Sequence, residues 1–303
     1  MNRDGMADFL ERLGHRVVRD GRAYWYDQRS RFMAAIPHTV PLVPDRDEQR
    51  RVMRASGALG VRHLAPVNGP GRMSYAFIVD DPAYDLQMLS GNTRSKVRRG
   101  LKQCEIGRMD PKEVRAEGRP VNDDTIRRLR FTKDVYDWNK YWDAVESSPG
   151  AEVWGARIDG TLVAYTVILH VEGCAEILVA RSHSEHLKHY PNNALIFTAV
   201  QDLIRRDDVD RVLFGFESVD TVTGVDAFKD SMAFRRWPIH QYIGLHPLAE
   251  RVLGYAWTKS LLQRLVDRRR DSEFWRKIEG VLIFHGSLAD RSETGKEQPA
   301  WTS

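Results

Sequence analysis

The stretch from Glu152 to Phe216 constrains the fold more strongly than any other part of the chain. Two residue pairs within it, Asp159-Gly160 and Glu172-Gly173, are typical of tight reversals, because glycine accepts a positive φ angle without steric cost. The apolar runs that these pairs separate predict an antiparallel meander, with strands at residues 152–158, 162–171 and 174–181. Local turns therefore set the order of these three strands.

A helix and a further strand follow the meander. Apolar residues recur with helical spacing between residues 194 and 206, and residues 211–216 form a short apolar run typical of a buried strand. A helical crossover makes this last strand parallel to its partner, so the sheet changes sense beside residues 174–181. Ligands enter open sheets at such changes. The pattern predicts an α+β (α/β mixed-sheet) fold, and an unrelated α+β domain with a purely structural mixed sheet fits it equally well.

The chain is long enough to bury one large core or two modest ones, with 303 residues of which 42% are hydrophobic. Its first segment reads as an incomplete α/β module, and the pattern of helices and strands restarts at about Ala83. A helix is expected from Asp123 to Trp138, just before the meander. We therefore predict an N-terminal module, a complete α/β domain, a helical extension and a disordered tail, at residues 1–82, 83–246, 247–285 and 286–303.

The composition indicates an intracellular protein. The two cysteines, Cys104 and Cys174, lie far apart and outside any metal-binding spacing, which predicts reduced thiols in a cytoplasmic protein. The N-terminal residues lack the apolar core of a signal peptide, and no run of about 18 apolar residues occurs. Neither secretion nor a transmembrane segment is expected.

Positive charge is clustered, since the formal net charge is only +4. A helix is predicted at residues 93–102, with Thr93 as its N-cap and with Val97 and Leu101 as a narrow buried stripe. Its remaining surface is cationic and carries Arg94, Lys96, Arg98, Arg99 and Lys102. Such a face attracts phosphates through a salt-sensitive interaction that is independent of sequence. An ordinary solvated surface is the alternative interpretation.

Three motifs resemble those of FemAB-like transferases, which belong to the GNAT acyltransferase superfamily. The run from Leu89 to Lys102 resembles the basic helix of these enzymes, and Tyr190-Pro-Asn-Asn-Ala-Leu195 resembles the loop and helix start after their central strand. The segment from Gly224 to Phe234 resembles their late Phe-Lys motif, with Ala233 in place of the usual glycine. The similarity covers about residues 60 to 245, and it depends on the order and spacing of the motifs together.

The resemblance implies a GNAT-like acyltransferase fold, with a truncated first GNAT-like module followed by a complete second one. It also implies an enzyme without a cofactor that moves an aminoacyl group from aminoacyl-tRNA to an amine of a small-molecule or peptide acceptor. Acyl-CoA is the alternative donor, and a non-catalytic RNA-binding descendant is a third interpretation. GNAT acetyltransferases bind the CoA pyrophosphate with a glycine loop, which the stretch from Arg181 to Lys188 lacks. This difference favours the tRNA-borne donor.

Acyl transfer to an amine needs a base and an oxyanion donor, but no covalent nucleophile. The resemblance assigns Lys229 to a substrate phosphate or to the negative charge of the transition state. Glu217, at the end of the last core strand, is predicted to position or deprotonate the amine, and Tyr190 to donate to the leaving group. Backbone N–H groups near Val179 and Ala180 are the predicted oxyanion donors. A solvent-facing lysine, a rim carboxylate and a packing tyrosine are the corresponding structural interpretations.

Three further residues are candidate substrate contacts. Asn192 and Asn193 either cap a helix that begins at Ala194 or contact the ligand. Phe228 lies directly before Lys229 and is either a substrate contact or part of the core.

Two kinds of ionisable residue need a separate explanation. Glu176 lies among apolar neighbours within a predicted strand, where an unpaired charge is costly, so it must have a partner or reach the cleft. No metal site is expected, because convincing ligand spacing is missing among His170, His183, His186, His189 and His240. Of these, His186 and His189 share a face only if their loop is helical.

Overall fold

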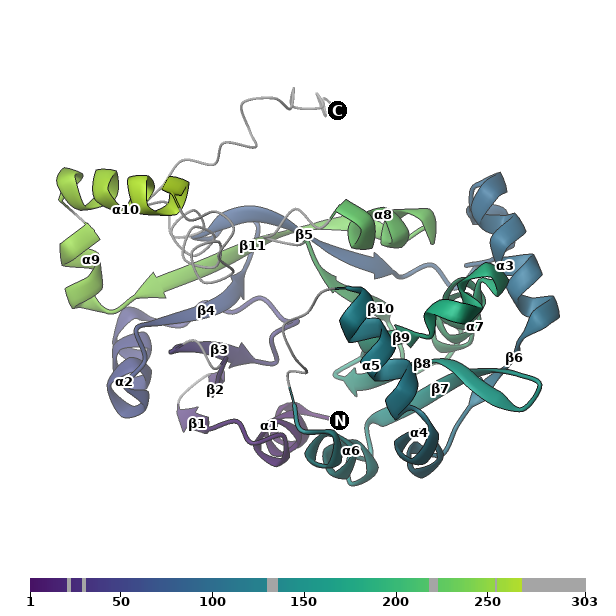
Figure 1. Cartoon of the computed structure of the whole chain (residues 1–303). Helices are drawn as coiled ribbons and strands as arrows, with labels where there is room; N and C mark the ends of the chain where they lie inside the picture. Colours follow the sequence, from purple (N-terminus) through teal and green to yellow (C-terminus); the bar gives the residue numbers. More distant parts are fainter. Residues whose placement is uncertain (21–22, 29–30, 130–135, 218–222, 254, 269–303) are drawn as a thin grey trace.

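The computed structural model describes residues 1–20, 23–28, 31–129, 136–217, 223–253 and 255–268, and the statements below concern these residues. They form one mixed sheet of eleven strands in the order β1-β2-β3-β4-β11-β5-β10-β9-β8-β7-β6 (Figure 1). The predicted mixed-sheet fold is thus confirmed. The strands are β1 (Val17–Asp20), β2 (Ala23–Asp27), β3 (Phe32–Ile36), β4 (Gly60–Ala65), β5 (Arg72–Val79), β6 (Glu105–Arg108), β7 (Ala151–Ile158), β8 (Thr161–Val171), β9 (Cys174–Ser182), β10 (Arg211–Phe216) and β11 (Arg235–Leu245).

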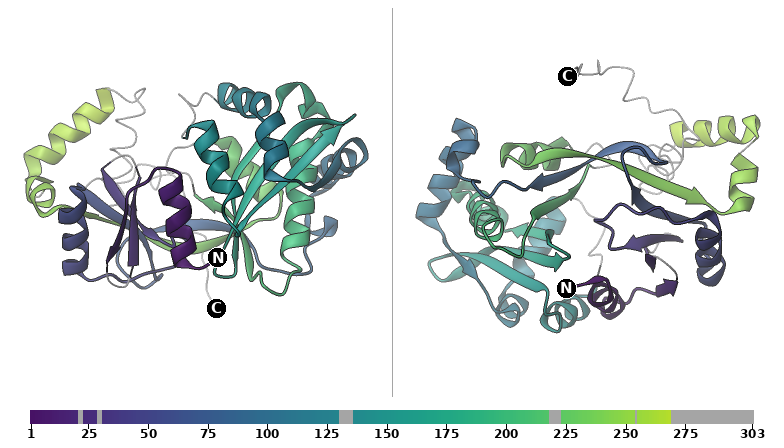
Figure 2. Two further views of the ribbon diagram at one scale, coloured as in Figure 1. Left: turned by 90° about the horizontal axis from the view of Figure 1, so that it is seen from below. Right: turned by 180° about the vertical axis from the view of Figure 1, so that it is seen from behind.

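Helices cover both faces of the half of the sheet that contains the meander (Figure 2). On one face α7 packs against α3, and their apolar side chains form one core cluster with β8 and β9. On the other face α1, α4 and α6 form a second cluster. The helices are α1 (Arg3–Arg12), α2 (Arg46–Ser56), α3 (Gly91–Gln103), α4 (Pro111–Glu117), α5 (Arg119–Arg128), α6 (Trp138–Glu146), α7 (Pro191–Leu203), α8 (Thr223–Ser231), α9 (Pro247–Leu253) and α10 (Ala256–Arg268), with 3-10 turns η1 (Leu86–Met88) and η2 (Ser184–His189).

The predicted meander is confirmed. Strands β7, β8 and β9 pair antiparallel, and β10 pairs parallel to β9 after the α7 crossover. Both predicted reversals have positive φ angles, at 49° and 76° for Asp159 and Gly160 and at 48° and 74° for Glu172 and Gly173. The change of sense therefore lies between β9 and β10.

Strands β9 and β10 separate because each carries an irregularity just beyond their last paired residues. Their parallel pairing ends at Glu176 and Leu213. On β9, Leu178 is an extra residue in the pairing with β8. On β10, the register to β5 shifts between Leu213 and Phe216, where Gly215 has a φ of 74° that favours glycine. Bulges of this kind bend strands apart and occur often beside active sites.

Strand β11 was missed by the sequence interpretation, although it lies near the centre of the sheet. It pairs antiparallel with β4 on one side and with β5 on the other (Figure 1). Its buried residues alternate, at Ile239, Gln241, Ile243 and Leu245, which is the signal that could have identified it. Pro238 obscured the strand in the sequence, because proline cannot donate to a neighbour. In the structure it lies in the part of β11 that pairs with β5 alone, since the pairing with β4 begins at His240, and proline is tolerated where one edge of a strand is unpaired.

Several helix boundaries differ from the predictions. The single helix expected from Asp123 to Trp138 is wrong at both ends. The structure has α5, which ends at Arg128, and α6, which begins at Trp138, and residues 130–135 between them lie outside the described part. Asp137 caps α6 by accepting hydrogen bonds from the N–H groups of Asn139 and Lys140. The predicted tail at 286–303 lies outside the described residues. Among the helices that are described, none combines the length and apolar character needed to cross a bilayer.

Candidate active site

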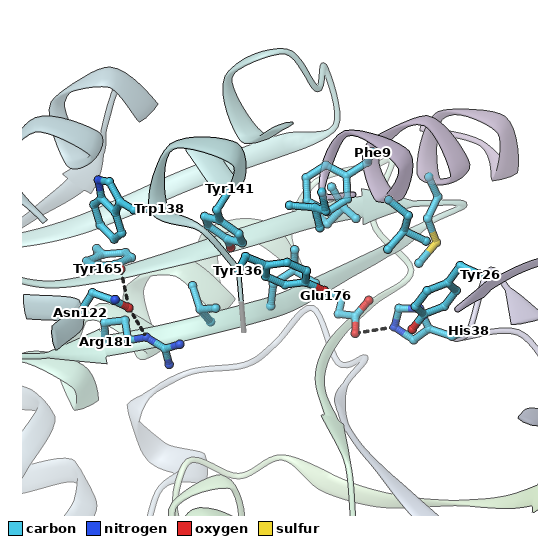
Figure 3. Close-up of a pocket in the computed structure, with 16 residues that line it drawn as sticks. Phe9, Tyr26, His38, Asn122, Tyr136, Trp138, Tyr141, Tyr165, Glu176 and Arg181 are labelled. Carbon is cyan, nitrogen blue, oxygen red and sulfur yellow. Dashed lines mark hydrogen bonds and ion pairs between the residues drawn. The ribbon is translucent and has the colours of Figure 1, made fainter. Parts of the chain in front are cut away.

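A cavity of about 400 Å³ lies beside the point where β9 and β10 separate. Helix α1 and strand β2 line it from one side, and α5, α6, β8 and β9 line it from the other. Figure 3 shows most of its wall as aromatic rings, with polar groups at two separate places. The labelled lining residues are Phe9, Tyr26, His38, Asn122, Tyr136, Trp138, Tyr141, Tyr165, Glu176 and Arg181.

The bulge on β9 determines which side chains reach this cavity. Side chains alternate between the two faces of a regular strand, and one extra residue reverses the alternation. Glu176 precedes the bulge, Leu178 is the extra residue of the bulge, and Val179 and Arg181 follow it. All four side chains nevertheless line the cavity. Four polar and apolar groups of one strand thus face the same space.

Glu176 and His38 form a pair at one end of the cavity. His38 Nε2 lies 2.8 Å from Glu176 Oε1, although the two residues are 138 positions apart in the chain. Glu176 is only 7% exposed, and its other oxygen, Oε2, is buried without a partner among the described residues. The Nδ1 atom of His38 is buried and unpartnered in the same sense. The isolated strand carboxylate of the sequence thus has both a partner and access to the cleft.

The other end of the cavity holds a partly buried guanidinium. Arg181 Nε donates to Asn122 Oδ1 at 3.0 Å, and the Tyr165 hydroxyl lies 3.5 Å from the same oxygen (Figure 3). Helix α5 holds this end of β9 in place, because Thr125 Oγ1 donates to the Ser182 carbonyl and accepts from the Ser182 N–H. The end of β9 is therefore bound to α5 where it departs from β10.

Hydrogen bonds fix two of the aromatic walls. The hydroxyl of Tyr136 lies 2.9 Å from Nε2 of His15, whose Nδ1 contacts both oxygens of Asp27, the carbonyl at 2.6 Å and a carboxylate oxygen at 2.9 Å. Burial raises the pKa of Tyr26 to about 12, so its hydroxyl stays protonated at neutral pH. The cavity thus has rigid neutral walls between its two polar ends.

On the opposite face of the sheet, the gap leads to the N-terminus of α7 and to α3. No side chain caps α7, whose N-cap residue is Tyr190 with a φ of 57° and whose first residue is Pro191. The Arg99 guanidinium carbon lies 4.7 Å above the centre of the Tyr190 ring. The helices approach closely at Gly100, where a Cβ atom would lie 2.7 Å from the Tyr190 carbonyl oxygen. An uncapped helix N-terminus beside arginine favours anions.

The basic helix differs in detail from its prediction. Ser90 caps α3, while Thr93 is buried inside its first turn, and Leu101 is 41% exposed rather than part of the buried stripe. Arg94 is bound locally, because it donates to the carbonyls of Gln87 and Leu89. The exposed cations of the helix are Arg98, Arg99 and Lys102, with Lys96 half-buried.

Lys229 is buried rather than exposed to solvent. Its ammonium lies 3.1 Å from the Phe216 carbonyl at the end of β10, 3.0 Å from Asp226 and 4.3 Å from the centre of the Phe77 ring. Phe216 in turn lies beside His38, at 6.3 Å between ring centres. Phe216 therefore contacts Lys229 through its carbonyl and His38 through its ring, and so it links Lys229 to the Glu176–His38 pair.

The remaining candidate residues lie around the gap, and most of them are outside the cavity. Val179 lines the cavity, and its carbonyl accepts a hydrogen bond from Thr166 Oγ1 on β8. The N–H of Ala180, on the opposite side of the same peptide unit, therefore points toward the gap.

The other candidates have contacts of their own outside the cavity. Glu217 lies 3.4 Å from Ser74 Oγ. The predicted caps are wrong, because α7 starts at Pro191. Other contacts are those of Asn192 with Ser182, of Asn193 with Met232 and of Phe228 with Phe214.

A cluster of possible metal ligands follows β9. At the start of η2, one ligand atom each from His183, Glu185 and His186 lies within 4.8 Å of the other two. The sequence interpretation considered His186 with His189, and the 3-10 turn brings both pairs close, with ring centres 5.9 Å apart for His183 and His186 and 6.3 Å apart for His186 and His189. Two histidines and one carboxylate are a ligand set that zinc accepts.

The sequence interpretation missed His38, Arg181 and the aromatic walls as site residues. Glu176 was singled out by its unusual position, whereas nothing near His38 in sequence signals a partner 138 positions away. The walls contributed by α1 and β2 come from the N-terminal segment. Only the folded chain brings them to the meander.

The comparisons with known proteins concern the fold. No family model and no curated protein sequence matches this chain. Among solved structures, the C-terminal domain of a protein described as a lysylphosphatidylglycerol synthetase from Agrobacterium fabrum is similar over 81% of this chain and 88% of its own, with 14% identity and a TM-score of 0.56. FemX is similar over 82% of this chain and 93% of its own, with 12% identity and a TM-score of 0.56.

L-PGS from Bacillus licheniformis is similar over 80% of this chain and 91% of its own, with 16% identity and a TM-score of 0.55. The three likenesses each cover 80–82% of this chain, which is far more than the meander alone. Such likeness at low identity is a likeness of fold. The chain therefore has a FemX-like fold, which it shares with L-PGS and with the Agrobacterium fabrum domain.

Proposed function

We propose that this protein is an aminoacyltransferase, which moves an aminoacyl group from aminoacyl-tRNA to the amine of a small acceptor and forms an amide bond. One observation supports this most strongly. The gap between β9 and β10 has a cationic helix end on one face and a cavity with a buried carboxylate on the other. A polyanionic donor and a small acceptor thus have separate approaches to one place.

The residues around the gap suit each part of the reaction. The acceptor amine attacks the ester carbonyl, the oxygen of that carbonyl becomes negative, and the ribose hydroxyl of the tRNA leaves with a proton. The Glu176–His38 pair is the base that accepts the proton of the amine. The Ala180 N–H, directed toward the gap, stabilises the oxyanion. Lys229 holds the end of β10 through the Phe216 carbonyl and thereby positions the opposite wall.

Two features beside the N-terminus of α7 indicate the donor, namely the loop that precedes it and the exposed face of α3. The loop before α7 is a 3-10 turn with Glu185 and without glycine, which is a poor cradle for a pyrophosphate. The exposed face of α3 beside it has three cations and no acid, which suits a longer phosphate backbone. Acyl-CoA remains the second candidate donor, because the uncapped α7 N-terminus after a splayed strand also fits one pyrophosphate.

The donor is tested with protein freed of nucleic acid by a high-salt wash. We expect label to move to an amine acceptor from tRNA charged with radioactive amino acids, and no transfer from acyl-CoA. A bound acyl-CoA at about a hundred times its Kd would stabilise the protein by roughly 2.7 kcal/mol, which a melting curve detects. Transfer from acyl-CoA together with such a shift contradicts the tRNA assignment. If the protein binds RNA but transfers no acyl group from either donor, the result supports a non-catalytic RNA-binding protein.

The basic face of α3 gives a separate prediction. Reversing Arg98, Arg99 and Lys102 to Glu should weaken tRNA binding and lower the slope of log K against log salt by about 2–3, since each lost phosphate contact removes roughly 0.7–0.9. The melting temperature should stay the same, because these side chains are exposed. Arg94 is left intact, because it holds backbone carbonyls.

The matched control for this variant reverses three exposed arginines of α2, at the other half of the sheet: Arg50, Arg51 and Arg54. It changes the net charge by the same amount. Equal losses of tRNA affinity in both variants would mean that general charge, rather than the α3 face, attracts RNA.

A further inference from the structure

We propose that the cavity binds the acceptor as a short peptide with an apolar or aromatic side chain, its amine at Glu176 and its free carboxylate at Arg181. This inference rests on the proposed function only for the role of the ligand as acceptor. The chemical character of the ligand follows from the cavity itself, whose two polar ends differ in charge and are separated by aromatic walls (Figure 3).

The end at Glu176 requires a donor of hydrogen bonds. Glu176 Oε2 is buried and has no partner among the described residues, and His38 Nδ1 beside it is in the same condition. A buried polar atom without a partner is costly and rare in folded proteins. An ammonium group supplies three donors and a charge opposite to that of the carboxylate. The structure thus holds a buried acceptor pair, and an amine is the group that completes it.

The end at Arg181 requires an anion. Its guanidinium donates from Nε to the amide oxygen of Asn122 at 3.0 Å and forms no ion pair with a carboxylate of the described residues. Guanidinium binds carboxylates through two parallel hydrogen bonds, and a neutral amide satisfies one donor only. An aminoacyl group esterified to tRNA has no free carboxylate. The carboxylate therefore belongs to the acceptor and not to the donor.

Aromatic rings define the space between the two ends. Phe9, Tyr136, Tyr141 and Tyr165 lie along it, and a volume of about 400 Å³ is within the range of small-molecule sites. Glu176 is the last residue of β9 that pairs with β10, so an amine bound there lies where the strands separate. The product of the reaction is then an aminoacylated peptide.

The test uses three probes that share the skeleton of the dipeptide Phe-Gly, measured by titration calorimetry on the full chain. Phe-Gly has both charged groups, Phe-Gly amide lacks the carboxylate, and 3-phenylpropanoyl-glycine lacks the amine. We expect Phe-Gly to bind about 10- to 100-fold more tightly than either probe with a single charged group, which is the range for a hydrogen bond to a charged group.

Two variants assign the ends. Glu176→Gln should reduce the affinity of Phe-Gly to that of 3-phenylpropanoyl-glycine, while leaving the affinity of 3-phenylpropanoyl-glycine itself unchanged. Arg181→Met should reduce the affinity of Phe-Gly to that of Phe-Gly amide, while leaving the affinity of Phe-Gly amide unchanged. The controls, Glu105→Gln and Arg119→Met, remove one exposed charge of each sign outside the cavity and should change nothing.

Equal affinities for all probes, binding of none of them, or a uniform loss for every probe in both variants would overturn the proposal. Its failure is distinguishable from failure of the proposed function, because the probes bind without any donor. Normal probe binding without transfer from charged tRNA would remove the proposed reaction and leave the ligand assignment intact.

Discussion

Replacing Glu176 by Gln is expected to lower the turnover of amine transfer by about 10²–10⁴-fold, the contribution of a positioned general base. The variant should fold, because the glutamine oxygen can still accept from His38 Nε2, which now contacts Oε1 at 2.8 Å. What it loses is the capacity to take the proton of the amine. Single-turnover transfer from charged tRNA measures the effect, and the exposed Glu105→Gln serves as the matched control.

Hydroxylamine separates the role of a base from that of a structural residue. It is a nucleophile that is already unprotonated at neutral pH, so its reaction needs no base from the protein. Glu176→Gln should therefore transfer the aminoacyl group to hydroxylamine at close to the wild-type rate. An equal loss with hydroxylamine and with the amine acceptor would show that Glu176 acts on the shape of the site and not on a proton.

Lys229→Met is expected to destabilise the protein by about 3 kcal/mol, the lower end of the range for breaking a buried ion pair. Lys229 is 5% exposed, and its removal leaves the Asp226 carboxylate and the Phe216 carbonyl without this donor. Urea unfolding measures the loss. Lys112→Met, which removes an exposed lysine from α4, should be neutral. Unchanged stability of the Lys229 variant would contradict the interactions that bury its ammonium.

Kinetics well below the melting temperature then decide what Lys229 does for the reaction. If its charge acts in the transition state, turnover should fall by about 10²–10³-fold, as for loss of one preorganised donor. If it binds a substrate phosphate, KM should rise with turnover nearly unchanged. The ammonium is already bound to the Phe216 carbonyl and to Asp226. We therefore expect turnover to fall by less than it would for a charge that acts in the transition state, because the variant only disturbs the position of β10. Wild-type kinetics in the folded variant would exclude Lys229 from the site.

The Phe-Lys motif ends in a turn that the structure describes. Ala233 stands where the resembling family has glycine, and its φ of 60° lies in the left-handed region that glycine favours. The Phe234 N–H completes this turn by donating to the Lys229 carbonyl. The backbone conformation of the glycine position is thus present although the residue is alanine.

Local chemistry determined the meander, its two reversals, the α7 crossover and hence the change of sense between β9 and β10. Each depends on residues within a few positions of one another, such as Asp159-Gly160, or on one hydrophobic period. The roles of the candidate residues on these elements stay predictions, and the cap expected from Asn192 or Asn193 is wrong, because Tyr190 is the N-cap of α7.

Only the tertiary structure decided what the gap contains. The Glu176–His38 pair joins residues 138 positions apart, and β11 lies between β4 and β5, which come far before it in the chain. Side chains of α1 and β2 complete a cavity on the meander, from which they are distant in sequence. Such contacts depend on which surfaces bury one another when the whole sheet forms, and no local period or turn encodes that choice.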